Sequence, residues 1–160
     1  APMIYYGDEA GMWGGDDPCD RMPMVWADLQ YDPQKADPLG RPREADEVKF
    51  DEKLHAYYDE AIRFRTRLPA LRHGEIEFLH TDDSARFLAF RRWTHDSQLL
   101  VALNRGSNLY QWELPLADGQ SLSQIFTASG EPEHHKVENK AGTAVVTVPA
   151  LDGVILRLRD

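Results

Sequence analysis

The sequence lacks the features that mark several common classes of protein. Cys19 is its only cysteine, which excludes an internal disulfide. Its longest apolar runs, such as residues 99–103, are far shorter than the roughly 20 residues of a membrane-spanning helix. The first residues contain no basic stretch followed by an apolar one, as a secretory signal peptide would. We therefore expect a soluble protein with no membrane partner, and the free thiol slightly favours the cytoplasm over the periplasm or secretion.

Positive charge is also scarce. The chain has 18 Lys and Arg against 27 Asp and Glu, a formal net charge of −9. A nucleic-acid surface needs a basic stripe to displace counterions, so we expect no nucleic-acid partner. Hydrophobic residues make up 42% of the chain and charged residues 28%, which argues against a wholly disordered chain. The composition is that of a folded, acidic protein that binds neutral or cationic partners.

The N-terminal run Met3-Ile4-Tyr5-Tyr6-Gly7 has no polar alternation, which predicts a strand buried on both faces of a parallel sheet. Such a strand needs neighbours, and no similar strand follows, so we expect part of the fold to lie upstream. Glycine and proline then break any regular pattern over residues 8–49 and predict a long loop. Its aromatic and methionine residues favour an ordered, site-lining segment over residues 8–31 and a more mobile one over 32–46.

A helix is predicted over residues 51–68. Asp51 is a suitable N-cap, and Pro69 stops regular propagation. The spacing of three and four residues between apolar side chains predicts one buried face, made of Leu54, Tyr57, Tyr58, Ala61, Ile62, Arg65 and Leu68.

The remaining residues predict an all-β domain. Turn signals such as Asp118-Gly119 and Asp152-Gly153 separate most of its short apolar segments. This spacing favours an antiparallel sandwich. The polar residues 131–142 are expected to form an exposed loop. The predicted strands cover residues 75–80, 85–93, 98–104, 109–114, 122–127, 143–148 and 154–158.

Several of these stretches resemble the end of an α-amylase superfamily enzyme, glycoside hydrolase family 13. Residues 1–12 are similar to the eighth barrel strand and the start of the loop after it, and residues 65–74 to the end of the eighth barrel helix. The resemblance implies a mixed fold. Residues 1–73 would end a (β/α)8 barrel, with strand 1–7, active-site loop 8–49 and helix 50–68, and residues 74–160 would form the β-sandwich domain C. The neopullulanase, cyclomaltodextrinase and maltogenic amylase branch is indicated by Gly14-Gly15-Asp16-Asp17-Pro18, Arg21, Pro23, Met24 and Trp26.

The resemblance also implies the chemistry of the parent protein, that is, of the longer enzyme whose C-terminal part these residues would form. A retaining glycosidase needs two carboxylates about 5–5.5 Å apart across the scissile bond. In this family the nucleophile Asp, the acid/base Glu and a supporting Asp follow strands four, five and seven, all upstream of Ala1. We therefore expect no catalytic residue within these 160 residues, and no activity from them alone. The parent would act on an α-glucan or maltooligosaccharide by hydrolysis or transfer, and the missing barrel portion would be a partner.

Candidate substrate-binding residues follow from the barrel, whose active sites lie at the carboxyl ends of the strands. Asp8 and Glu9 cannot replace the catalytic pair, because adjacent side chains leaving a strand point to opposite sides. Each candidate also has a structural alternative, namely hydrogen bonds that hold the loop, or packing within it. The candidate pocket rim and wall consist of Tyr6, Asp8, Glu9, Trp13, Asp17, Arg21 and Trp26.

No cofactor is expected. Asp16, Asp17 and Asp20 lack the ligand spacing of a calcium site. Calcium binding elsewhere in the parent protein is not excluded. The pair His134-His135 lacks further ligands and is expected in a solvated loop. The sequence is compatible with two other interpretations: a stand-alone β-sandwich that binds carbohydrate or another chain, and a parent enzyme acting on sucrose or trehalose. It is also compatible with a homo-oligomer.

Overall fold

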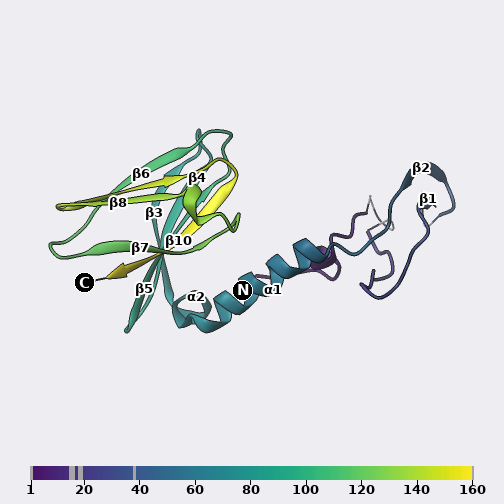
Figure 1. Ribbon diagram of the computed structural model, residues 1–160, viewed down its shortest axis with the longest axis horizontal. Helices are drawn as coiled ribbons and strands as arrows, with labels where there is room; N and C mark the ends of the chain where they lie inside the picture. Colours follow the sequence, from purple (N-terminus) through teal and green to yellow (C-terminus); the bar gives the residue numbers. More distant parts are fainter. Residues whose placement is uncertain (1, 15–16, 18–19, 38, 160) are drawn as a thin grey trace. The chain divides into compact units, whose positions relative to one another are not determined.

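The computed structural model describes residues 2–14, 17, 20–37 and 39–159. Ala1, Gly15, Asp16, Pro18 and Cys19, which entered the sequence arguments, lie outside the described residues. The chain divides into two compact units, Ala1–Phe64 and Arg65–Asp160, with the boundary inside the long helix. The elements of each unit are labelled in Figure 1.

The first unit contains little regular structure. A 3-10 turn, η1 (Asp8–Ala10), is followed by a hairpin of strands β1 (Gln34–Ala36) and β2 (Pro42–Asp46) and then by helix α1 (Glu52–Arg67). The hairpin corrects the expectation of an irregular segment over residues 8–49. Its turn closes on Asp37, whose Oδ1 accepts hydrogen bonds from the backbone N–H groups of Leu39 and Arg41, both at 2.9 Å.

The predicted strand over residues 3–7 is not formed. Residues 3–5 have no regular structure, and residues 6 and 7 belong to a turn that leads into η1. Met3 is 87% exposed, and Ile4, Tyr5 and Tyr6 are also exposed. A parallel strand takes its hydrogen bonds and its burial from neighbouring strands, and the described part of the chain supplies none beside these residues.

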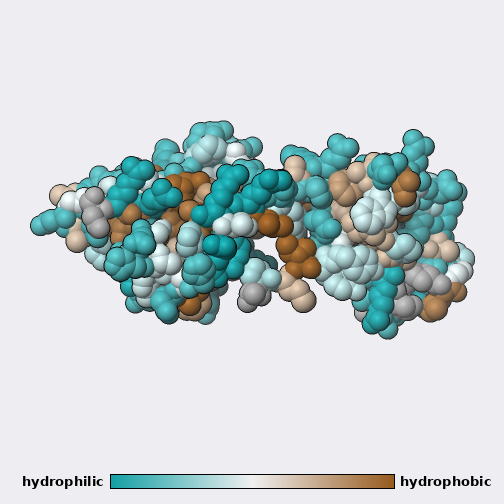
Figure 2. Space-filling view, turned by 90° about the horizontal axis from the view of Figure 1, so that it is seen from below, coloured by the Kyte–Doolittle hydropathy of each residue, from teal (hydrophilic) through white to brown (hydrophobic). Residues whose placement is uncertain are grey.

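Helix α1 confirms the predicted helix to within a residue at each end, and Asp51 caps it by accepting a hydrogen bond from the Leu54 N–H at 2.9 Å. The predicted burial of one face is wrong in this structure, because no residue of α1 is buried. Tyr57 and Ile62 are 40% and 48% exposed. Figure 2 shows that hydrophobic residues remain visible on this face of the surface among the hydrophilic ones.

A short helix, α2 (Pro69–His73), opens the second unit and buries Ala70 and Leu71. Neither α1 nor α2 is long and apolar enough to cross a membrane. The second unit is otherwise made of strands, with one 3-10 turn, η2 (Pro132–His134). The strands are β3 (Glu75–Asp82), β4 (Phe87–Thr94), β5 (Ser97–Asn104), β6 (Tyr110–Pro115), β7 (Ser121–Thr127), β8 (Lys136–Lys140), β9 (Thr143–Val148) and β10 (Asp152–Arg159).

These strands form two antiparallel sheets, with strand orders β3-β4-β5-β10-β7 and β6-β9-β8, and confirm the predicted antiparallel sandwich (Figure 1). Alternate residues of β9 point inward, since Ala144, Val146 and Val148 are fully buried, whereas the central strand β5 buries four consecutive residues, Leu99–Ala102. The core between the sheets consists of Phe87, Ala89, Leu100, Ala102, Trp112, Leu114, Leu116, Leu122, Ala144, Val146, Val148, Val154 and Leu156.

Residues 131–142 do not form the exposed loop that we expected. They contain η2 and β8, and β8 pairs antiparallel with β9. Strand β8 lies at the edge of its sheet and carries mostly polar residues, so it shows none of the apolar alternation by which strands are predicted. His135 is also not solvated, since its side chain is fully buried and its Nε2 lies 3.5 Å from the Asp152 carboxylate.

A hydrogen-bond network holds the turn between β3 and β4. The Asp82 carboxylate accepts hydrogen bonds from the Ser84 hydroxyl at 2.7 Å, the Ala85 N–H at 2.9 Å and the Tyr110 hydroxyl at 3.2 Å. These bonds, that from Ser84 first, lower the pKa of Asp82 below its ordinary value. Burial, and then the neighbouring Asp82, raise the pKa of Tyr110.

The network predicts an acid-sensitive contribution to stability. A carboxylate whose pKa is lowered by folding stabilises the fold fully above its unfolded pKa of about 3.9, and the effect is lost as the pH falls through the folded pKa. We expect Asp82→Asn to lower the urea midpoint at pH 7, and the deficit to shrink between about pH 5 and 2. Asp118→Asn, which removes the same charge from an exposed turn, is the control. A deficit that stays constant from pH 7 to pH 2 contradicts the prediction.

Candidate functional site

Two hollows in the first unit lie along the loop that follows residue 7. The larger has a volume of about 440 Å³ and is lined by residues between 11 and 51. The smaller, of about 230 Å³, is lined by residues between 5 and 22. Met12, Trp13 and Met22 line both, so they form a shared wall.

A tight turn over residues 5–12 positions this wall. Gly7 and Gly11 have left-handed φ angles of 93° and 70°, which favour glycine. The Met12 N–H donates to the Gly7 carbonyl at 3.0 Å, and a Cβ added to Gly7 would lie 2.6 Å from the Met12 sulfur. The close approach therefore requires glycine at position 7, and it turns Met12 back toward the start of the segment.

Asp8 and Glu9 hold this same turn. Asp8 Oδ2 accepts a hydrogen bond from the Tyr5 N–H at 3.0 Å, and Glu9 Oε2 accepts one from the Gly7 N–H at 3.1 Å. Both residues lie in η1 rather than at the end of a strand. Asp8 also lines the smaller hollow, whereas Glu9 lines neither hollow. Sugar contact by either carboxylate stays a prediction.

Tyr6 and Trp13 complete the part of the predicted rim that the structure brings together. The Tyr6 hydroxyl donates to the Met22 carbonyl at 2.8 Å and ties the turn to the far side of the loop. Trp13 is 38% exposed, and the Arg43 guanidinium lies 4.0 Å from its ring centroid in a cation–π contact. Tyr6, Asp8 and Trp13 thus gather around the smaller hollow.

The other predicted wall residues lie outside both linings. The Arg21 Nε lies 2.9 Å from the Asp17 carboxylate and 3.9 Å from that of Asp20, and all three side chains are more than half exposed. Trp26 is 55% exposed, and its backbone N–H donates to the Tyr31 hydroxyl at 2.6 Å. The structure therefore does not bring Asp17, Arg21 and Trp26 together with Tyr6, Asp8 and Trp13.

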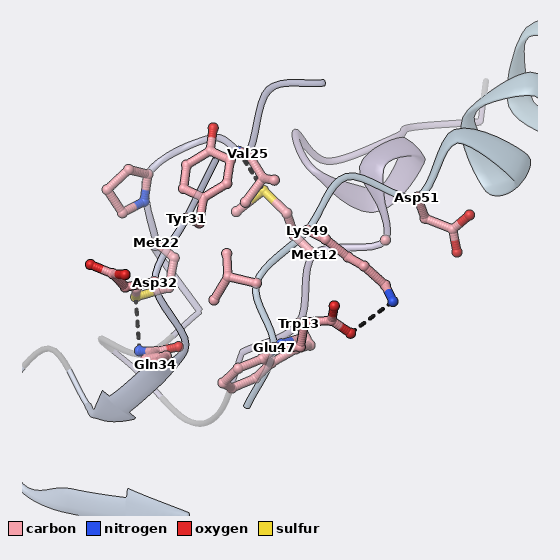
Figure 3. Close-up of a pocket in the computed structure, with 13 residues that line it drawn as sticks. Met12, Trp13, Met22, Val25, Tyr31, Asp32, Gln34, Glu47, Lys49 and Asp51 are labelled. Atoms are coloured by element: carbon pink, nitrogen blue, oxygen red, sulfur yellow. Dashed lines mark hydrogen bonds and ion pairs between the residues drawn. The ribbon is translucent and has the colours of Figure 1, made fainter. Parts of the chain in front are cut away.

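Most residues that line the larger hollow were not predicted from the sequence, which indicated only Trp13 among them. Thioethers shape its interior, since the Val25 N–H lies 3.4 Å from the Met12 sulfur and the Gln34 amide nitrogen lies 3.7 Å from the Met22 sulfur. Figure 3 shows Met22 and Gln34 on one side and Met12 and Trp13 facing them. The apolar and aromatic residues of segment 8–31 were a signal for this hollow, but their spacing does not tell which side chains converge.

The return of the chain after β2 supplies the charged wall of the larger hollow. The Lys49 ammonium lies 2.7 Å from the Glu47 carboxylate, which raises the pKa of Lys49 (Figure 3). Asp51 also lines the hollow while it caps α1. Of its three carboxylates, Glu47 and Asp51 are thus engaged and Asp32 is the third. The apolar interior suits a ligand with one apolar face, and Asp32 suits its hydroxyl groups.

Metal ligands do not gather in the described residues. No group of three or more His, Cys, Asp and Glu side chains converges among residues 2–14, 17, 20–37 and 39–159. Asp17 and Asp20 both lie beside Arg21. The two adjacent histidines have different partners. The His134 Nδ1 lies 2.7 Å from the Glu131 carboxylate, and the His135 Nε2 lies 3.5 Å from the Asp152 carboxylate.

Comparison with known proteins finds relatives named neopullulanase and cyclomaltodextrinase. No family model matches the chain. Neopullulanase 2 of Thermoactinomyces vulgaris is 30% identical over 155 residues, which are 97% of this chain and 23% of the relative. A cyclomaltodextrinase of Geobacillus thermopakistaniensis is 30% identical over 128 residues, 79% of this chain and 18% of the relative. The chain thus spans less than a quarter of these relatives.

Solved structures agree with the sequence relatives. A cyclomaltodextrinase structure has a TM-score of 0.68 and 25% identity, and the match covers 98% of this chain and 23% of that one. The α-amylase from H. orenii shares the fold, with a TM-score of 0.71 and 23% identity over 98% of this chain and 32% of that chain. The chain therefore resembles a C-terminal fragment of α-amylase superfamily enzymes of glycoside hydrolase family 13, with neopullulanase and cyclomaltodextrinase among its relatives.

Proposed function

We propose that these 160 residues are the C-terminal part of a retaining α-glucan-acting glycoside hydrolase or transglycosylase. Residues 1–73 would complete the catalytic barrel, residues 74–160 would supply domain C, and the catalytic acids would come from the rest of the parent protein. The match of 97% of this chain to only 23% of neopullulanase 2 carries this proposal. The exposure of apolar side chains in α1, none of which is buried, and in residues 3–6 supports it.

Burial of the exposed apolar surface of α1 would be favourable. Tyr57 and Ile62 are 40% and 48% exposed, so burying that remainder would stabilise the fold by roughly 1 kcal/mol each. Burial of the exposed residues 3–6 would also stabilise the fold. A barrel strand and a barrel helix that lack the other strands and helices of the barrel would show this pattern of exposure. The chain spans 23% of neopullulanase 2, so the rest of such a relative is long enough to supply those strands and helices.

The carboxylates around the hollows support a binding role and not an acid/base role. Asp8 and Glu9 accept backbone hydrogen bonds, Glu47 pairs with Lys49, and Asp51 caps α1. A retaining pair must instead flank one glycosidic bond about 5–5.5 Å apart. We propose that the rim residues of the smaller hollow contact a glucose ring, with Trp13 against its apolar face.

The alternative of a stand-alone binding module is favoured by one observation. The sandwich has a complete core of its own, with Phe87, Leu156 and Val146 fully buried. That alternative leaves the apolar face of α1 without a purpose. The names of the matched relatives, neopullulanase, cyclomaltodextrinase and amylopullulanase, favour an α-glucan over sucrose or trehalose as the substrate of the parent.

Reducing-sugar release tests the proposal. We expect none from pullulan or maltooligosaccharides with the chain alone, and activity after mixing with the upstream part of Thermoactinomyces vulgaris neopullulanase 2. In that mixture Trp13→Ala should raise KM about fivefold, because a stacked aromatic face is worth on the order of 1 kcal/mol. Trp26→Ala, outside both hollows, is the matched control and should leave KM unchanged.

Activity from the pure chain alone would contradict the placement of the catalytic acids outside it. Equal effects of the two tryptophan substitutions would contradict the assigned rim. Maltooligosaccharide binding to the sandwich alone, with no activity in any mixture, would instead support the stand-alone module.

A further inference from the structure

A third hollow lies at one end of the sandwich, where three connections between strands meet, and the proposed function does not use it. Its volume is about 450 Å³. It lies between the β3–β4 turn, the β5–β6 connection and the β9–β10 turn. The lining side chains that matter below are Ser84, Arg86, Arg105, Ser107, Tyr110 and Leu151.

The backbone around this hollow adopts an uncommon conformation. Arg86 and Leu151, with φ angles of 57° and 56°, are the two described residues other than glycine that have a positive φ, and both line it. Such residues occur in tight turns, as here, and they also cluster at ligand sites. The Arg105 N–H donates to the Arg86 carbonyl at 2.9 Å, and the Leu151 N–H donates to the Gly106 carbonyl at 3.2 Å. These bonds hold the three connections together.

The hollow concentrates unpaired positive charge in an acidic chain. Its lining includes Arg86 and Arg105 and no described acidic residue. Neither guanidinium forms an ion pair within the described ranges, whereas Arg63 pairs with Asp59 and Arg91 pairs with Glu77. The net charge of the whole chain is −9, so two unpaired arginines on one hollow are a local exception.

Two carboxylates at the ends of these connections, those of Asp82 and Asp152, form no ion pair with either arginine. Asp82 accepts hydrogen bonds from Ser84, Ala85 and Tyr110, and Asp152 accepts them from the backbone N–H groups of Ser129 and Gly153. Both carboxylates therefore face their own turns. The hollow keeps a double positive charge that suits a ligand with two negative charges.

We infer that this hollow binds a phosphate monoester. A phosphate ester carries close to two negative charges at neutral pH and offers three acceptor oxygens, which match two guanidinium groups and the Ser107 hydroxyl. The volume lies within the range of about 300–1,000 Å³ found for small-molecule sites, which leaves room for the esterified group.

The apolar part of the lining receives that esterified group. Leu151 is 80% exposed and forms one wall. Tyr110 forms another, and its ring is held by stacking on Phe87 at 4.0 Å and by a hydrogen-bond contact of its hydroxyl with His80 at 2.8 Å. A sugar phosphate has both the charge and the carbon skeleton for this site, and free phosphate shares the charge alone. The inference does not depend on the proposed function.

Amide chemical-shift titrations of the full 160-residue chain test the inference, with glucose 1-phosphate, inorganic phosphate and glucose as probes. We expect glucose 1-phosphate to shift amides of residues 84–86 and 105–109, inorganic phosphate to shift the same amides with weaker affinity, and glucose to leave them unchanged. Arg86→Asn with Arg105→Gln should weaken binding of glucose 1-phosphate at least about tenfold, since charge-assisted hydrogen bonds are lost. Asn tolerates the left-handed backbone of position 86.

Arg159→Gln, which removes the same charge from the other end of β10, is the matched control and should change affinity less than about twofold. If the double variant does not fold, Arg105→Gln alone should still weaken binding at least about threefold, because position 105 carries no positive φ. Inorganic phosphate binding as tightly as glucose 1-phosphate would support a site for the phosphate group alone. Equal binding of glucose, or equal losses in Arg159→Gln and the double variant, would overturn the inference.

Discussion

Replacing Phe87 with alanine is expected to lower the free energy of unfolding of the sandwich by about 3–5 kcal/mol. Phe87 is 1% exposed, and its ring stacks on Tyr110 with a centroid distance of 4.0 Å and an interplanar angle of 13°. Its ring also lies 6.3 Å from that of Trp112. The substitution removes this ring and leaves a cavity between the sheets. Because small domains have only about 5–15 kcal/mol of stability, urea unfolding should show a large shift.

Phe78→Ala is the matched control for this prediction. Phe78 lies on the neighbouring strand β3, is 65% exposed, and meets Phe90 edge to face at 6.1 Å. Its removal should cost less than about 1 kcal/mol, because most of the ring is already in water. Equal losses from Phe78→Ala and Phe87→Ala would show that the core does not lie where the structure has it.

Replacing Asn104 with alanine is expected to cost about 3 kcal/mol, through lost hydrogen bonds rather than lost volume. Asn104 is 1% exposed. Its amide nitrogen lies 2.9, 3.0 and 2.8 Å from the carbonyl oxygens of Asn108, Val148 and Pro149, to which its two hydrogens donate, and its carbonyl oxygen accepts from the Gly106 N–H at 2.9 Å. Alanine would remove these bonds from backbone groups that are buried or partly buried.

The control for Asn104 lies in the same connection. Asn108 is exposed, and it contributes its backbone carbonyl, not its side chain, to the bond with Asn104. Asn108→Ala should therefore change stability by less than about 0.5 kcal/mol in the same urea titration. A loss from Asn104→Ala no larger than that from Asn108→Ala would contradict the role assigned to the buried amide.

Elements whose signal is local were predictable from the sequence. Strand β9 has the predicted bounds, because its alternation of apolar residues matches one buried face. Helix α1 was predictable because Asp51 and Pro69 are adjacent end signals. Strand β8 was not, since it is polar and its existence depends on pairing with β9.

Features that depend on distant residues could not be predicted. Burial of residues 3–7 and of the α1 face needs neighbours outside these elements, and apolar pattern alone does not supply them. In the candidate site, Tyr6, Asp8 and Trp13 gather because one short turn connects them. Glu47 and Lys49 join the larger hollow only through the return of the chain after the hairpin, which residue spacing does not reveal.

Amide hydrogen exchange can test whether an apolar face of this chain completes a larger barrel, as we propose. Exchange of residues 3–7 and of α1 should be fast in the isolated chain and should slow at least about tenfold when the upstream part of neopullulanase 2 is added, because burial by a partner closes these segments to water. Amides of β5 and β9, already in the sandwich, should not change and serve as the internal reference. Exchange of residues 3–7 and α1 that is equally fast with and without the upstream part would contradict the account.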